Sequence, residues 1–318
     1  MKLRNTFKLL FSNLRAVMSD FLFRFTLTVI LSAVTASFLV PFIKEVISSE
    51  AAAKLLDALK GVIGAFFSAG TEMAAGSEAL SEANREFFSM LGDKMGDITL
   101  VAIGVIAVLI VYAMFFGFAN YASGVVINSY MSSLSKIGYV SAILHGFGKC
   151  FMYQLISVFA FIIWNIVLFT ASYFTFVLTA SALLVMSLPL AVLILVAGNA
   201  LYGVFFSCFL PSLTAGGNGI IKGIKESFSL GAKKFGELFA QFIFIILFVF
   251  YANVSVTVFT LGAGFIFSLP ATCVCITCLK LVNYYSFVGR KYYIDYDNII
   301  VPPGMKSEED GFINGIDM

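Results

Sequence analysis

The residues best suited to metal or redox chemistry are three cysteines in one apolar segment, Cys273, Cys275 and Cys278. Thiolates bind soft metal ions, and paired thiols carry out redox exchange. On one continuous helix, however, Cys275 and Cys278 lie about 60° apart, whereas Cys273 points about 160° to 200° away from them. One helix therefore cannot bring all three to one ion. We interpret these cysteines as small side chains that pack against neighbouring helices, and we expect no metal site.

The only histidine, His145, stands just before a long apolar segment. A single histidine excludes histidine-rich metal sites and the HExxH zinc motif. The glycine-rich run 216–219 is followed by Ile-Ile-Lys-Gly, which does not match a nucleotide-binding P-loop. We therefore predict no catalytic residue and no cofactor, and the sequence favours a protein without enzymatic activity.

A few polar residues lie inside apolar segments, and Lys280 is the deepest charge among them. Asn165, Asn199 and Asn253 fall near the middle of three other apolar segments. Such groups need partners in hydrocarbon, so one interpretation is a polar pathway or pocket that includes Lys280. The other is hydrogen bonding that holds helices together. Arg24 stands one turn from the start of its segment, and we expect its side chain to extend to the headgroup layer.

Small residues and prolines mark further features of these segments. Gly117 follows Ala113 by one turn and Ser207 follows Gly203 by one turn, a spacing that predicts close helix contacts. Pro189 and Pro270 each follow Ser-Leu inside an apolar segment. Proline kinks a helix, so both are candidate hinges, and static packing is the alternative.

The segments that carry these residues are long enough to cross a membrane. The chain is 60% hydrophobic and 12% charged, against about 45–50% and about 25% in soluble domains. Residues 151–221 and 238–279 hold no charged residue. A bilayer core requires about 20 apolar residues per helix. We predict six spans, at about 21–43, 98–121, 151–173, 182–210, 238–259 and 263–287.

Lysine and arginine lie on one side of this layout. They precede the first span, follow the sixth, and occupy the connections between spans two and three and between spans four and five. Residues 44–97 instead hold nine acidic and five basic residues. The positive-inside rule therefore places both termini in the cytoplasm, in a protein of the plasma (cytoplasmic) membrane.

Each predicted pair of spans follows a segment with apolar residues at helical spacing, around 3–18, 134–151 and 221–238. We expect these segments to lie in the inner headgroup layer with basic residues toward anionic lipid. Those headgroup-facing residues are Arg15, Lys149, Lys222, Lys225, Lys233 and Lys234. The predicted fold is all-α, with three hairpins around a pseudo-threefold axis, each preceded by a cytoplasmic interfacial helix. The three units could share an ancestor, or they could resemble one another only because helical hairpins with basic inner loops look alike.

Residues 1–297 are expected to form a single transmembrane domain, and residues 298–318 a flexible acidic tail. Within that domain, segment 44–97 is predicted to form two amphipathic helices outside the cytoplasm. These helices could bind a partner or cover the ends of the spans.

For function, the sequence favours a multi-pass, non-enzymatic membrane protein that acts through lipid or partner interaction. The bilayer is the expected partner, with another membrane protein or a second copy of the chain as candidates. No nucleic-acid partner is expected at a net charge of +2. A transporter or channel subunit with a polar site near Lys280 is the alternative.

Overall fold

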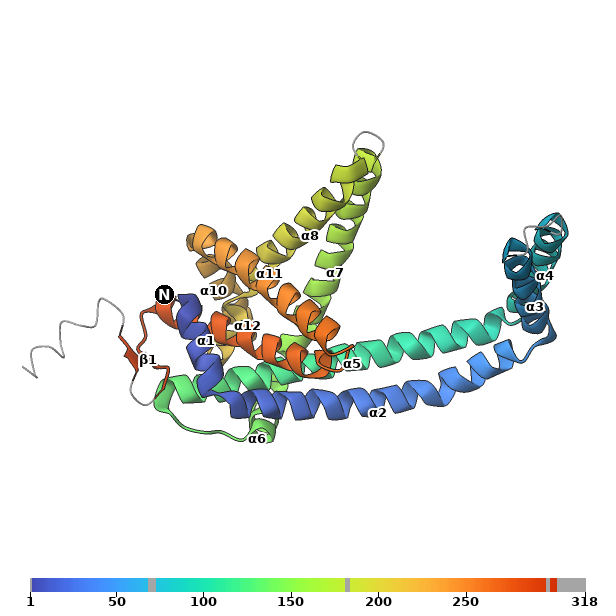
Figure 1. The fold of residues 1–318 in the computed structure, drawn as a ribbon. Coiled ribbons are helices and arrows are strands. Elements are labelled where there is room, and N and C mark those ends of the chain that lie inside the picture. The colour runs from blue at the N-terminus through green and yellow to red at the C-terminus, as the bar shows by residue number, and fades with distance from the viewer. Residues whose placement is uncertain (1, 68–72, 181–183, 296–297, 302–318) are drawn as a thin grey trace, which may run out of the picture. The chain divides into compact units, whose positions relative to one another are not determined.

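A computed structural model describes residues 2–67, 73–180, 184–295 and 298–301, almost entirely as helix (Figure 1). The helices in chain order are α1 (Lys2–Ser12), α2 (Leu14–Ile47), α3 (Glu50–Phe67), α4 (Met73–Asp93), α5 (Met95–Ser133), α6 (Tyr139–His145), α7 (Phe147–Ala180), α8 (Leu184–Phe206), α9 (Phe209–Thr214), α10 (Ile220–Lys233), α11 (Phe235–Phe259) and α12 (Phe265–Val288). Two short strands, β1 (Tyr292–Tyr293) and β2 (Ile299–Ile300), pair in antiparallel fashion near the end.

Six of the described helices are long and apolar enough to cross a membrane: α2, α5, α7, the segment Val185–Thr214, α11 and α12. This result confirms the six apolar helices predicted from the sequence. Most of them extend beyond the predicted spans, because helical structure continues into the polar flanking residues. The predicted start of the fourth span, at Ala182, lies outside the described residues.

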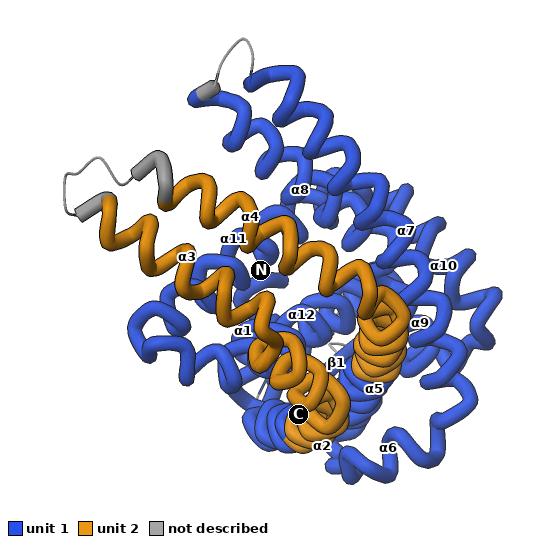
Figure 2. The backbone as a smooth tube through the Cα atoms, turned by 90° about the vertical axis from the view of Figure 1, so that its right-hand side faces the viewer, with its two compact units in different colours: residues 1–25, 113–318 blue, residues 26–112 orange. Residues whose placement is uncertain are grey.

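The chain divides into two compact units (Figure 2). Unit 2, residues 26–112, contains α3, α4 and the adjoining parts of α2 and α5. Lys54 of α3 lies 3.0 Å from Glu86 of α4, and this ion pair raises the pKa of Lys54. The two spanning helices meet where the Phe38 ring packs on Gly104. Segment 44–97 thus holds two helices, while its side of the membrane and its role stay predictions.

Unit 1, residues 1–25 and 113–318, is held together by close contacts between its helices. Trp164 Nε1 of α7 donates a hydrogen bond to the Gly198 carbonyl of α8 at 3.0 Å. The Phe242 ring of α11 packs on α8 where Gly203 has no side chain. Gln154 of α7 occupies the space beside Gly117 of α5, so the close contact predicted at Gly117 is confirmed. Glycine permits these approaches because any side chain there would overlap its neighbour.

The last spans are joined to each other and to the N-terminal helix by polar contacts. Ser268 Oγ of α12 donates to Asn253 Oδ1 of α11 at 2.6 Å. Helix α1 packs on α12, and the Asn5 side chain donates to the Tyr292 hydroxyl at 3.1 Å. Lys2 of α1 lies 2.6 Å from Glu237 of α11. The apolar face of α1 is consequently half-buried against this core.

Helix α10 docks through a row of small residues, Gly223, Ser227 and Gly231, all of which are buried. Ser227 Oγ donates to the Phe205 carbonyl at 2.6 Å, and Gly231 approaches the Val204 carbonyl. The spacing of four residues puts all three on one edge of the helix. This edge lets the two backbones come close, and it leaves the bulky residues of α10 on other sides.

A half-buried carboxylate fixes α10 from a second side. Glu226 accepts hydrogen bonds from the Ser212 hydroxyl, the Asn218 amide and the Tyr284 hydroxyl. These donors come from α9, the connection that follows it, and α12. A carboxylate with three donors from neighbouring segments is well satisfied, so Glu226 ties α10 to the end of the bundle.

Candidate functional site

An ion pair lies in the interior of unit 1, between two residues one turn apart on α2. Asp20 is 0% exposed and Arg24 is 3% exposed. Arg24 Nε lies 2.5 Å from Asp20 Oδ2, and its Nη2 lies 3.2 Å from Oδ1. Residues four apart share a helix face, so the pair forms without any change in the backbone.

Helix α5 supplies the next set of contacts to this pair. Arg24 Nη2 donates to Asn120 Oδ1 at 2.8 Å, and Nη1 donates to the Phe116 carbonyl at 3.3 Å. The guanidinium also lies 3.7 Å from the centre of the Phe116 ring. Ser123 Oγ donates to Asp20 Oδ1 at 2.9 Å. Each charge therefore has several polar partners, as burial requires.

Tyr139, the first residue of α6, completes the network. Its hydroxyl lies 2.8 Å from Asp20 Oδ1 and 2.9 Å from the Ala119 carbonyl, so its one proton can serve either acceptor. Burial raises the pKa of Tyr139, and the Asp20 carboxylate raises it further. The phenol thus stays protonated and remains a donor.

The expectation that Arg24 extends to the headgroup layer is wrong, because its side chain is buried and paired. Sequence reasoning misses Asp20, because this residue stands just before the apolar run and outside it. Its position four residues before Arg24 was the available signal. The other partners, Asn120, Ser123 and Tyr139, lie about a hundred residues away, and no local pattern marks them.

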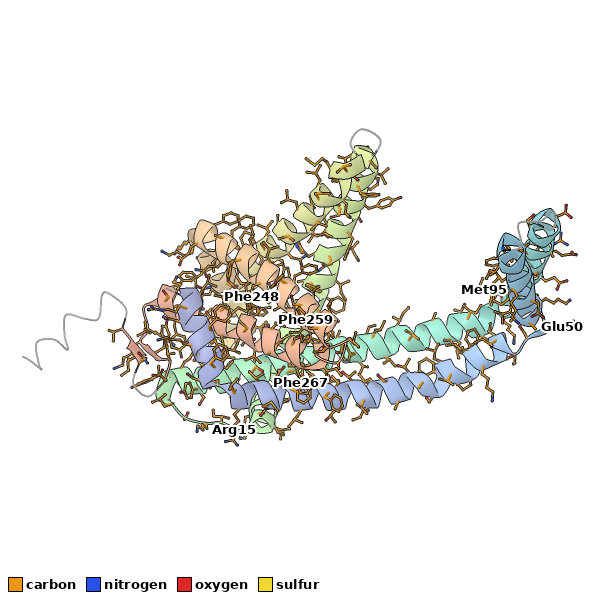
Figure 3. All side chains as sticks on the ribbon, in the orientation of Figure 1. Arg15, Glu50, Met95, Phe248, Phe259 and Phe267 are labelled. Atoms are coloured by element: carbon orange, nitrogen blue, oxygen red, sulfur yellow. The ribbon has the colours of Figure 1, made fainter. Side chains whose placement is uncertain are left out.

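A pocket of about 180 Å³ adjoins this network. Its lining comes from the junction of α1 and α2, from α5, and from the connection that leads into α6. The residues are Ser12, Asn13, Arg15, Ala16, Ser19, Val126, Tyr130, Ser135, Lys136, Ile137, Gly138 and Tyr139. Figure 3 shows Arg15 where α1 meets α2. We call this cavity the Arg15–Lys136 pocket.

The four residues of the predicted polar pathway lie in separate surroundings in the structure. Lys280 is half-buried in α12, and no hydrogen bond or ion pair recorded for the described residues involves its side chain. Asn165 and Asn199 donate to carbonyls of their own helices, at 2.8 and 2.9 Å. Asn253 bonds to Ser268, as described above. In the part of the chain that the structure describes, no hydrogen bond joins these four residues to one another. Their role in transport stays a prediction.

The two candidate hinges occupy different surroundings. Pro189 is exposed in α8, whereas Pro270 is buried in α12. The structure therefore gives them no shared environment. The six predicted headgroup-facing residues, Arg15, Lys149, Lys222, Lys225, Lys233 and Lys234, are all exposed in unit 1. Their position relative to lipid stays a prediction.

Comparison with known proteins gives no assignment, because no family, no curated protein and no solved structure matches this chain. The candidate site consequently rests on its own geometry. That geometry contains a paired charge in the interior and an open, cation-lined pocket beside it. The ion pair suits a structural role, and the pocket has room for a ligand.

Proposed function

We propose that this chain is a non-enzymatic, multi-pass membrane protein that acts through contact with lipid on its cytoplasmic face. In this proposal the spans form three hairpins, and α6 and α10 lie in the inner headgroup layer. The excess of lysine and arginine in the segments that contain these helices supports the cytoplasmic assignment.

The observation that carries the proposal is the exposed apolar side of α10, on which the Phe228 ring also stacks against Phe205 of α8. Ile221 is 73% exposed and Phe228 is 43% exposed, and both lie on one side of the helix. The neighbouring side carries Lys222 and Lys225, which are exposed as well. Water disfavours large exposed apolar side chains, whereas an interfacial helix buries them in the acyl layer and turns its lysines to anionic headgroups. The small-residue edge of α10 makes this arrangement compatible with docking on α8.

Helix α6 supports the same interpretation. Val140 and Leu144, one turn apart, are 63% and 68% exposed. Ala142 and Ile143 face the core instead, and the exposed Lys149 follows shortly after the helix. The face that points away from the protein is therefore apolar, with a cation near its end, as in α10.

The depth of α10 in a bilayer tests the proposal directly. Trp164 is the only tryptophan, so a Trp164→Phe background allows one reporter to be placed at will. Ile221→Trp is expected to be quenched by phospholipids brominated on the acyl chain. Ser229→Trp, on the lysine side of the same helix, is the matched control and is expected to stay unquenched.

Equal quenching of the two reporters, or none of either, would contradict an interfacial α10. The transport alternative predicts something different, namely that Lys280→Met abolishes flux of a solute. Uptake in cells that express the wild-type or the substituted chain would measure that effect. Unchanged uptake of an identified substrate would rule out a pathway through Lys280.

A further inference from the structure

The Arg15–Lys136 pocket has the composition of an anion site. Arg15 and Lys136 contribute two cations, Ser12, Ser19 and Ser135 contribute hydroxyls, and no carboxylate is among its described lining residues. We propose that this pocket binds a phosphate group, and we take a lipid headgroup as its main source. The inference rests on the proposed lipid function in its choice of source, but it concerns a different part of the chain.

The charges around the pocket favour an anion. The nearest carboxylate in the network beneath it, Asp20, is already neutralised by Arg24. Arg15 and Lys136 have exposed side chains and remain available at the rim. An arginine fork and a lysine ammonium are the donors that phosphate oxygens prefer, and serine hydroxyls complete such sites.

The backbone on both sides of the pocket holds these residues in place. Helix α1 ends at Ser12, and the Asn13 side chain donates to the Leu9 carbonyl at 3.0 Å, which fixes the junction with α2. On the other side, Leu134 takes a left-handed conformation with φ of 55° and ends α5. Ser129 then bonds to Ser135 and orders the connection that carries Lys136. The pocket is therefore formed by turns with defined contacts.

Placed by the predicted start of the first span, the pocket would lie near the level of the headgroup phosphates. Arg15 precedes Phe21, the start of the first apolar run, by about 9 Å of helix. The polar layer on each side of a bilayer is about 5 to 8 Å thick. A flexible arginine side chain easily covers the remaining distance. A phosphate in the pocket would also lie close to Tyr139, which lines it.

Native mass spectrometry of the full chain in detergent measures the binding. The probes are phosphatidylglycerol, phosphatidylcholine and inorganic phosphate. We expect the double variant Arg15→Gln, Lys136→Gln to bind phosphatidylglycerol about a hundredfold more weakly, about tenfold for each lost charged hydrogen bond. The matched control Lys54→Gln, Lys60→Gln removes the same charge from exposed positions of α3 and is expected to change binding little. Arg15→Lys, Lys136→Arg keeps both cations and is expected to retain most of the binding.

Competition with inorganic phosphate distinguishes a lipid headgroup from a soluble phosphate as the ligand, and the variants test whether the pocket binds either. Displacement of phosphatidylglycerol by millimolar inorganic phosphate would support the phosphate site and assign it to a soluble ligand. Resistance to that competition would support a lipid ligand. Equal losses in the two Gln double variants, or no loss in either, would overturn the proposal. The quenching assay on α10 is repeated in the Arg15→Gln, Lys136→Gln variant. Quenching that is unchanged while binding is lost limits the effect to the pocket, whereas loss of both shows that the lipid contact of α10 is affected as well.

Discussion

The ion pair between Asp20 and Arg24 gives the sharpest prediction for stability. Asp20→Ala leaves a guanidinium in the protein interior without its carboxylate, while its hydrogen bonds to the Asn120 and Phe116 oxygens remain. Breaking one side of a buried pair costs about 3 to 5 kcal/mol. Replacing both charges, in Asp20→Leu with Arg24→Met, removes that penalty. The half-buried Asn120 amide oxygen and the Phe116 carbonyl then lose a donor, and the buried Ser123 hydroxyl loses its acceptor, which costs about 1 to 3 kcal/mol.

Unfolding in mixed micelles titrated with SDS measures these free energies. Glu237→Ala is the control, since it breaks the ion pair with Lys2 in the same unit at a carboxylate whose side chain is 43% exposed. Its loss is expected to stay below about 1 kcal/mol. The reasoning is refuted if Asp20→Ala costs no more than Glu237→Ala, or if the double replacement is more damaging than Asp20→Ala alone.

Three further perturbations follow from the same contacts. Glu226→Ala removes the acceptor of three donors and is expected to lower the free energy of unfolding by about 1 to 3 kcal/mol, measured by the same titration. Gly117→Ala overlaps the Gln154 amide and is expected to cost about 1 to 3 kcal/mol, whereas Gly148→Ala, with open space around it, serves as a control that loses little. Tyr139 has a raised pKa in the folded chain, so its contribution is fully present below about pH 10 and falls as the pH rises further. Unfolding measured from pH 8 to 11 should therefore decline less steeply in Tyr139→Phe than in the wild type, and equal slopes would contradict this assignment.

The six spans could be predicted because an uninterrupted apolar run is a local signal that no distant contact alters. The segments before spans three and five also form separate helices, α6 and α10, as their apolar spacing indicates. The docking edge of α10 could also have been predicted, because small residues stand at a spacing of four, at Gly223, Ser227 and Gly231.

The buried network could not be predicted in the same way. Arg24 has the same side chain whether it reaches lipid headgroups or a protein interior, and the choice depends on partners supplied by α5 and α6. The Arg15–Lys136 pocket likewise joins two parts of the chain more than a hundred residues apart. Such juxtapositions depend on tertiary packing, which hydropathy and periodicity do not encode.

Tyr139 belongs to both the pocket, which it lines, and the buried network, in which its hydroxyl contacts Asp20. A ligand that orders Tyr139 therefore also orders the contact that holds α6 against α2. Occupancy of the pocket and resistance to unfolding are then linked quantities, and a ligand at a hundred times its Kd adds about 2.7 kcal/mol to the folded state. A membrane rich in the lipid whose headgroup fills the pocket would therefore stabilise the folded protein, as a structural cofactor stabilises a soluble protein.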